Sequence, residues 1–252
     1  MKITQVRNAT VIIEYGSKRF LIDPMLGAKG AFAPFPLTGN KLRNPVVELP
    51  MPVDEILRGI DAAIITHTHL DHIDPPALEV IDKQLQIFVQ DNKDADFMRK
   101  HGFINVSILS TETLFGDVTL HKTPGKHGAF PMILIAGNTC GIVFRKRWEK
   151  TLYLVGDTIW YDGVKKTLAE YTPEVILVNA GGNKFKGFRP VIMHEKDVLE
   201  VHRHAPQSTI VATHMEGVNH NTVTRKALRK FAENNGFSGK LIIPDNGQTI
   251  SL

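Results

Sequence analysis

The stretch His67-Thr68-His69-Leu70-Asp71-His72 constrains this chain more than any other, because it gathers three imidazoles and one carboxylate into six residues. The apolar run at 62–65 just before it predicts a buried strand. Asp74, which is followed by two prolines, predicts the start of a helix. The cluster is therefore expected on a tight loop between the end of a strand and a helix.

Imidazole and carboxylate are the ligands that zinc and similar divalent ions prefer. Four such side chains on one short loop cannot all reach the same ion. His67 and His69 can point one way while Asp71 and His72 point the other, so the motif predicts two adjacent metals. A solvated histidine-rich loop is the alternative, but this spacing has far fewer structural uses than metal-binding uses.

The pattern His-x-His-x-Asp-His resembles the signature of the metallo-β-lactamase superfamily. The resemblance implies the α/β class, as a four-layer αββα sandwich with a two-metal hydrolytic site on one edge. Further matches extend it over almost the whole chain, so we expect one metal-dependent hydrolase domain covering residues 1–252.

Three later strand ends resemble the remaining ligand positions of that superfamily. His127 lies between glycines after one strand, Asp157 belongs to a Gly-Asp-Thr element, and His214 follows a late strand. By this resemblance His67, His69 and His127 hold one metal, and Asp71, His72 and His214 hold the other. Asp157 bridges both, since a carboxylate has two oxygens and can span cations about 3.5–4 Å apart. A surface-loop role for His127 and a helix N-cap role for Asp157 are the alternatives.

Three further residues are candidates for assisting roles. Asp23 precedes Pro24 at a strand end, where a carboxylate bonding backbone amides in a turn is the plainer interpretation. His194 lies in the first turn of a helix predicted at 193–204. A histidine at this position resembles the L-ascorbate-6-phosphate lactonase-like branch of the superfamily. His220 lies on the loop after His214. Together with Asp71, we therefore name His194 and His220 as candidate catalytic residues.

Three other segments carry structural expectations. Residues 3–14 alternate as one strand, and 132–136 with 140–144 flank Gly137-Asn138 as a hairpin. A short strand pair is expected within 241–250. The long proline-rich segment Met25–Pro52 is expected to be either a substrate-access lid or a structural arm of the kind found at dimer contacts.

Bulk properties narrow the setting. The chain has 252 residues and a net charge of +4, which does not by itself indicate nucleic acid as a partner. The single cysteine, Cys140, fits a reducing compartment, and neither a signal-like segment nor a membrane-spanning apolar run is present. A cytoplasmic location, a small-molecule substrate and a possible homo-oligomer are expected.

Two divalent ions carry a charge of +4, and Asp71 and Asp157 leave +2, so a bridging water is expected to act as hydroxide near neutral pH. Zinc and manganese are favoured, and iron is possible. We expect a hydrolase acting on a small, anionic ester or lactone, because the few cations near the ligand loops can hold one phosphate or carboxylate: Lys126, Lys184, Lys186 and Arg189. A phosphodiesterase or ribonuclease of the same superfamily is one alternative, and a non-hydrolytic metal-binding or redox scaffold is the other.

Overall fold

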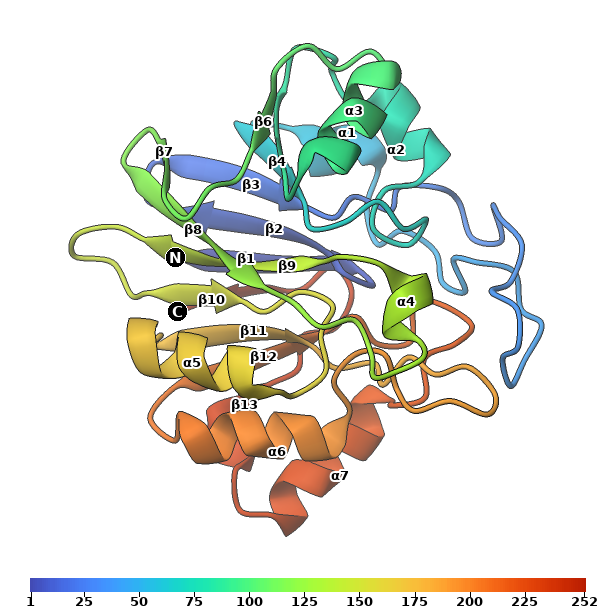
Figure 1. Cartoon of the computed structure of the whole chain (residues 1–252), viewed down its shortest axis with the longest axis vertical. Helices are drawn as coiled ribbons and strands as arrows, with labels where there is room; N and C mark the ends of the chain where they lie inside the picture. The colour runs from blue at the N-terminus through green and yellow to red at the C-terminus, as the bar shows by residue number, and fades with distance from the viewer.

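Two seven-stranded sheets form the centre of the molecule (Figure 1). The computed structural model describes all residues 1–252. The first sheet contains, from edge to edge, β14 (Thr249–Ser251), β1 (Lys2–Arg7), β2 (Thr10–Tyr15), β3 (Lys18–Ile22), β4 (Ala62–Ile65), β5 (Gln86–Val89) and β6 (Val106–Ile108). The second contains β13 (Leu241–Ile242), β12 (Thr209–Thr213), β11 (Val175–Asn179), β10 (Leu152–Leu154), β9 (Cys140–Arg145), β8 (Val118–Pro124) and β7 (Thr113–Phe115).

Both sheets follow one pairing scheme. In the first sheet β14, β1, β2 and β3 pair antiparallel, and β3, β4, β5 and β6 pair parallel. In the second, β7 to β10 pair antiparallel and β10 to β13 pair parallel. Parallel neighbours deliver their carboxyl ends to the same edge of a sheet, which is where loops can combine into one site.

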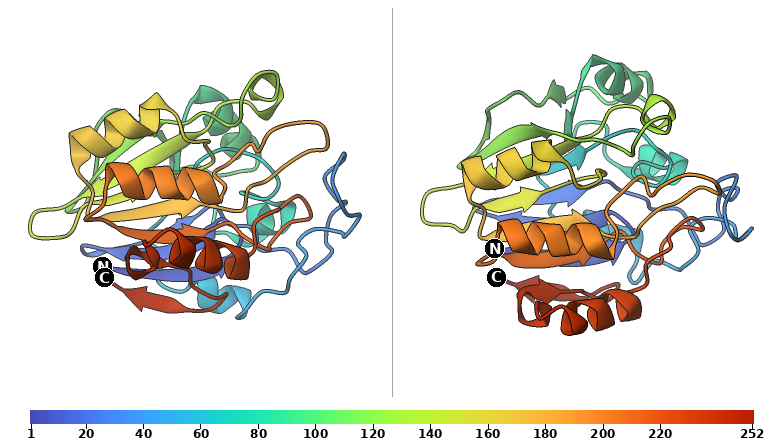
Figure 2. Two further views of the ribbon diagram at one scale, coloured as in Figure 1. Left: turned by 90° about the horizontal axis from the view of Figure 1, so that it is seen from below. Right: turned by 60° about the horizontal axis from the view of Figure 1, so that its bottom comes forward.

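Helices cover the outer face of each sheet, and the faces toward each other pack together (Figure 2). Helices α1 (Val53–Leu57), α2 (Pro75–Val80) and α3 (Asn92–Lys100) lie on the first sheet. Helices α5 (Asp162–Tyr171), α6 (Glu195–His204) and α7 (Arg225–Asn234) lie on the second. A short helix α4 (Ile133–Ala136) and a 3₁₀ turn, η1 (Ser238–Lys240), complete the elements. The expected four-layer αββα sandwich in one domain is confirmed.

The core has three layers, as this architecture requires. Aliphatic and aromatic side chains such as Ile13, Phe20 and Phe144 fill the space between the sheets. Val198 and Leu228 pack between the second sheet and its helices. A separate apolar cluster packs between the first sheet and its helices. No helix combines the length and hydrophobicity needed to cross a bilayer.

Three sequence expectations were wrong in detail. Residues 3–14 form two strands, because Asn8 adopts φ +55° and turns the chain between β1 and β2. Residues 133–136 form α4 instead of a strand, with Leu134 and Ile135 exposed, so the apolar run there did not signal a buried strand. The two short strands at the C-terminus join different sheets, β13 pairing with β12 and β14 with β1.

Candidate metal centre

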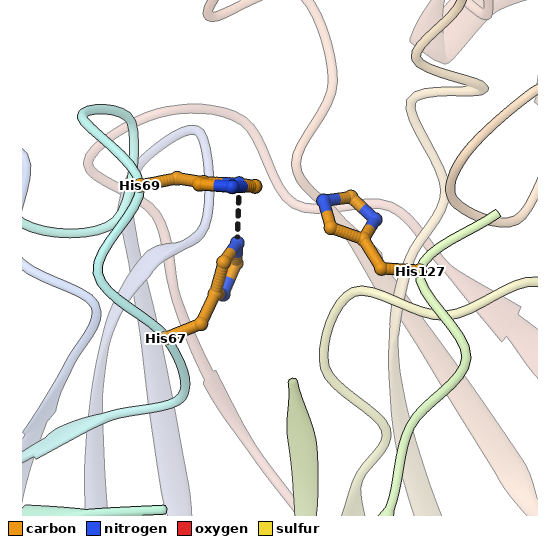
Figure 3. Close-up of side chains that lie close together, drawn as sticks. All are labelled: His67, His69 and His127. Atoms are coloured by element: carbon orange, nitrogen blue, oxygen red, sulfur yellow. Dashed lines mark hydrogen bonds between the residues drawn. The ribbon is translucent and has the colours of Figure 1, made fainter. Parts of the chain in front are cut away.

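Seven side chains from four strand ends converge at one edge of the sandwich. The side chains after β4 are His67, His69, Asp71 and His72. His127 follows β8, Asp157 follows β10 and His214 follows β12. They fall into three overlapping sets whose ligand atoms lie within 4.8 Å of one another: His67, His69 and His127; His67, His72 and Asp157; Asp71, His72 and His214. Figure 3 shows the first set, in which His67 Nε2 lies 2.9 Å from His69 Nδ1. The structure thus brings together all seven predicted ligands.

Asp157 occupies the middle of this cluster. Its Oδ2 lies 3.2 Å from His72 Nε2 and 3.7 Å from His127 Nε2, and its Oδ1 lies 3.7 Å from His214 Nε2. It is not a helix N-cap, since α5 begins only at Asp162. One carboxylate therefore faces both the His67/His69/His127 set and the Asp71/His72/His214 set.

Hydrogen bonds fix which nitrogen faces the centre in three of the imidazoles, those of His127, His72 and His67. His127 Nδ1 lies 3.0 Å from the carbonyl oxygen of Val191, which can only accept, so Nδ1 carries the proton and Nε2 keeps its lone pair. His72 Nδ1 lies 2.8 Å from Asp23 Oδ2 and is oriented in the same way. Such outer partners are typical of histidines that bind metals.

His67 is oriented in the same way, by a hydrogen bond between its Nδ1 and a hydroxyl group. Thr66 Oγ1 donates to Asp23 Oδ2 at 2.8 Å, so it accepts from His67 Nδ1 at 3.2 Å. In their neutral forms, these three imidazoles present Nε2 lone pairs toward the cluster. This donor set of imidazole and carboxylate fits divalent metal ions of the zinc, manganese or iron type.

Burial and charge set the protonation of the cluster. Burial lowers the pKa of His67 well below its ordinary value and lowers the pKa of His69 to about 4. Burial by itself would raise the pKa of Asp157, but His72 and His214 hold that pKa well below its usual range. The site therefore offers neutral imidazoles beside an ionised carboxylate, which are the forms that bind cations.

His72 differs from its neighbours. Burial opposes its charged form, but Asp157 and Asp23 raise its pKa well above the ordinary value. Without a metal, a proton on His72 compensates the two carboxylates. Binding of a cation would release that proton.

Backbone shape contributes to the same edge. His214 adopts φ +59°, a conformation that non-glycine residues hold only when their surroundings require it. A Cβ at Gly181 would lie 2.0 Å from the His214 carbonyl oxygen, so only glycine allows that approach. The glycine pair after β11 thus serves the close packing of the His214 loop.

Three supporting residues escaped the sequence interpretation. Asn179 Nδ2 donates to Asp157 Oδ1 at 2.6 Å, and Asn8 Nδ2 donates to the Asp71 carbonyl oxygen at 3.1 Å. Thr66 links Asp23 to His67 as described above. Asn179 ends a buried strand, which is a signal that could have been used, whereas the contact of Asn8 spans 63 residues and has no local signature.

A cavity of about 320 Å³ opens onto the centre. His69, Asp71, His127 and Asp157 form its polar floor, and His220 also lines it. The remaining wall is largely apolar and is built by Phe35, Leu70, Met132, Ile135, Ala136, Phe185 and Val191. None of Lys126, Lys184, Lys186 and Arg189 lines this cavity.

The two remaining candidates occupy different places. His220 lines the cavity and is buried. His194 caps α6, with its Nδ1 2.8 Å from Asp197 Oδ2, and lines a separate pocket with Trp160 and Arg189. The structure therefore does not bring His194 to the metal centre, since the helix cap holds its ring elsewhere.

The segment Met25–Pro52 reaches the cavity through Phe35 and is fixed to the fold elsewhere. Arg7 is fully buried and donates to the carbonyl oxygens of Met25, Gly27 and Val47. Asn44 and Asn219 exchange further hydrogen bonds. The segment is thus an anchored arm that also supplies one wall of the cavity.

The family model described as the beta-lactamase superfamily domain matches residues 18–215. Together with the sandwich and its edge site, this shows that the chain belongs to the metallo-β-lactamase superfamily. Within it, the chain belongs to the UPF0173 metal-dependent hydrolase family: UPF0173 protein YddR of Bacillus subtilis (strain 168) is 44% identical over the full length of both chains.

Two solved structures are similar over nearly their whole length. An isothiocyanate hydrolase from Delia radicum gut bacteria is 41% identical with a TM-score of 0.96, covering 100% of this chain and 99% of that chain. A possible metal-dependent hydrolase from Veillonella parvula DSM 2008 is 38% identical with a TM-score of 0.97 and the same coverage. The chain is accordingly a metal-dependent hydrolase.

Proposed function

We propose that this hydrolase acts on a small, neutral isothiocyanate with an apolar substituent, at a centre of two divalent metal ions. The observation that carries the proposal is the cavity: its polar groups lie on the floor, its walls are apolar and no lysine or arginine lines it. The similarity to an isothiocyanate hydrolase over the full chain supports the same substrate class.

His67, His69 and His127 would hold one ion, Asp71, His72 and His214 the other, and Asp157 both. When bound, the ions supply a nucleophile from water at neutral pH and polarise the substrate. The chain itself orients the imidazoles through Asp23, Thr66 and Val191 and excludes bulk water with the apolar wall.

The reaction balances without a redox partner. Water oxygen bonds to the central carbon of R–N=C=S, one of its protons ends on nitrogen and the other on sulfur, and a thiocarbamic acid forms. Breaking its C–N bond, with transfer of the sulfur proton to nitrogen, gives the amine and carbonyl sulfide. Phe35, Met132 and Phe185 line the cavity and would hold an apolar R group.

A small ester or lactone is the second candidate, because its carbonyl carbon is open to the same attack. Because no lysine or arginine lines the cavity, we favour neutral members over the anionic ones expected from the sequence. This lining also disfavours the phosphorylated substrates of the L-ascorbate-6-phosphate lactonase-like branch. A phosphodiester or RNA chain would need a basic, extended groove, and a cavity without lysine or arginine in its lining offers none.

A substrate panel tests the proposal. Protein loaded with zinc or with manganese would be assayed on benzyl isothiocyanate, a neutral γ-lactone, a phosphate-bearing lactone, bis-p-nitrophenyl phosphate and a structured RNA. We expect chelator-sensitive release of amine from the isothiocyanate and no cleavage of the last three. Lactone opening without amine release would favour the second candidate, and metal-dependent RNA cleavage would contradict both.

A further inference from the structure

His220 is the one histidine that lines the cavity without belonging to any of the three ligand sets. Its ring packs against Phe35 at 4.5 Å and Phe185 at 5.3 Å between ring centroids. Only 6% of the residue is exposed. The imidazole is thus held between two aromatic side chains of the wall, next to the polar floor.

A relay of amides determines which nitrogen of His220 carries the proton. The backbone N–H groups of Gly217 and Val218 donate to Asn221 Oδ1 at 2.8 and 3.0 Å. A backbone N–H can only donate, so this oxygen is assigned by chemistry and Asn221 Nδ2 must be the donor on its other side. Asn221 Nδ2 donates to Asn183 Oδ1.

The relay ends on the imidazole. With its oxygen occupied by Asn221, Asn183 presents Nδ2, which donates to His220 Nε2 at 3.0 Å. A nitrogen that accepts a hydrogen bond carries no proton, so His220 is neutral and its proton is on Nδ1. This is the same Nδ1–H form as in His67 and His127, but here the lone pair on Nε2 accepts a hydrogen bond from Asn183.

The Nδ1–H group of His220 has no hydrogen-bond partner, although it is buried. A buried donor without a partner costs stability, and native proteins rarely keep one without use. Because Nδ1 holds the proton and Nε2 is occupied, neither nitrogen can bind a metal. The group is available only as a hydrogen-bond donor.

We infer that His220 Nδ1–H donates a hydrogen bond to the substrate heteroatom on which negative charge develops when water adds to the central carbon. This role rests on the proposed function. For R–N=C=S that heteroatom is sulfur or nitrogen, and for an ester or lactone it is the carbonyl oxygen. Asn183 and Asn221 are positioning residues that hold the donor tautomer.

A preorganised donor of this kind is worth more than a donor from solvent, because it needs no reorientation as charge develops. His220 lines the same cavity as His69, Asp71 and Asp157, and the two aromatic side chains packed against its ring shield it from water. His220 would then act on the substrate without holding a metal ion. Its loss should therefore leave metal binding intact.

The first test replaces the donor and keeps the packing. His220→Phe should lower kcat about 100-fold on the best substrate of the panel, with little change in KM and with metal content unchanged. His202→Phe is the matched control: His202 also has an unpartnered Nδ1 and stacks on Phe237 at 5.2 Å, but on α6. It should keep wild-type kcat.

The second test changes the tautomer and keeps the histidine. Asn183→Asp replaces a donor by an isosteric acceptor, so His220 should move its proton to Nε2. Long-range ¹H–¹⁵N correlations in the metal-free, ¹⁵N-histidine-labelled protein report this directly, with the His220 signals assigned by their loss in His220→Phe. We expect Nδ1–H in the wild type, Nε2–H in Asn183→Asp, and a fall in kcat similar to that of His220→Phe.

The outcomes separate this inference from the proposed function. If isothiocyanates are not hydrolysed, the substrate class is wrong, while the tautomer measurement and the kinetics on the substrate that is turned over still decide the role of His220. Wild-type kcat in His220→Phe, an Nε2–H tautomer in the wild type, or loss of metal in His220→Phe would each overturn the inference.

Discussion

Asp23 Oδ2 lies 2.8 Å from His72 Nδ1, and the same carboxylate accepts hydrogen bonds from the backbone N–H and the hydroxyl of Thr66. One buried carboxylate therefore joins the end of β3 to both ends of the histidine motif. It acts as more than the turn carboxylate of the plainer interpretation, because it also fixes the nitrogen that His72 presents to the centre.

Replacing this carboxylate should weaken the metal centre. In Asp23→Asn the amide oxygen can still accept a hydrogen bond from Thr66. The amide has no negative charge, so it no longer provides the charged acceptor that orients His72. We expect metal affinity to fall about 10- to 100-fold, with the fold retained. Competitive titration with a chelating dye would measure this. Asp96→Asn, at an exposed position on α3, is the control, and equal affinities in the two variants would refute the role.

Asp71 should matter for turnover. Its Oδ2 lies 3.4 Å from His214 Nε2, and its pKa is held well below its usual range by His214 and His72 although burial opposes this. Asp71→Asn removes a negative charge from the ligand set. We expect turnover to drop at least about 100-fold, which corresponds to about 3 kcal/mol. Circular dichroism would check the fold, and near-normal turnover on any confirmed substrate would count decisively against the proposed centre.

The arm should govern substrate choice through Phe35. Its side chain forms part of the cavity wall, and it belongs to none of the ligand sets. Phe35→Ala should enlarge the cavity and improve kcat/KM for bulkier isothiocyanates relative to small ones, without changing metal content. Leu42→Ala, at an exposed position of the same segment, provides a control. If Phe35→Ala instead loses metal and unfolds at lower temperature, the arm is chiefly structural.

Acid should destabilise the metal-free protein in part through His220, whose pKa burial lowers to about 4. Between pH 6.5 and 4 the unfolded chain binds a proton on this histidine and the folded chain does not, so stability falls as pH falls. His220→Phe lacks this effect. Relative to the wild type, the variant should gain about 3 kcal/mol between pH 7 and pH 4 in urea unfolding. A difference independent of pH would contradict the lowered pKa.

Much of the site could be predicted because the ligands follow strand ends in a recognisable order. The His67–His72 motif lies within six residues, so it can be recognised from local sequence alone. The Gly-Asp-Thr element identified Asp157 in the same way. The remaining contacts are long-range. Nothing near Val191 in the sequence indicates that its carbonyl orients His127, because that contact depends on how the two halves of the sandwich close.

The fold errors have local causes of a similar kind. An alternating pattern does not reveal that Asn8 reverses the chain, since the residues on both sides are buried and suit strands equally well. Apolar residues at 133–135 suggested a strand, yet Leu134 and Ile135 are exposed, and Ile135 lines the cavity, where apolar surface has a binding use. The anionic substrate stays a prediction; it was based on cations near the ligand loops, and the sequence alone does not show that none of those cations lines the cavity.

The hydrogen bonds from Arg7 to the arm all end on carbonyl oxygens, those of Met25, Gly27 and Val47. Every amino acid supplies a carbonyl oxygen, so this attachment does not depend on the side chains of the arm. Residues such as Phe35 can therefore be exchanged while the path of the backbone is kept. In this chain, one arginine thus separates the anchoring of the arm from the side chains with which the arm faces the cavity.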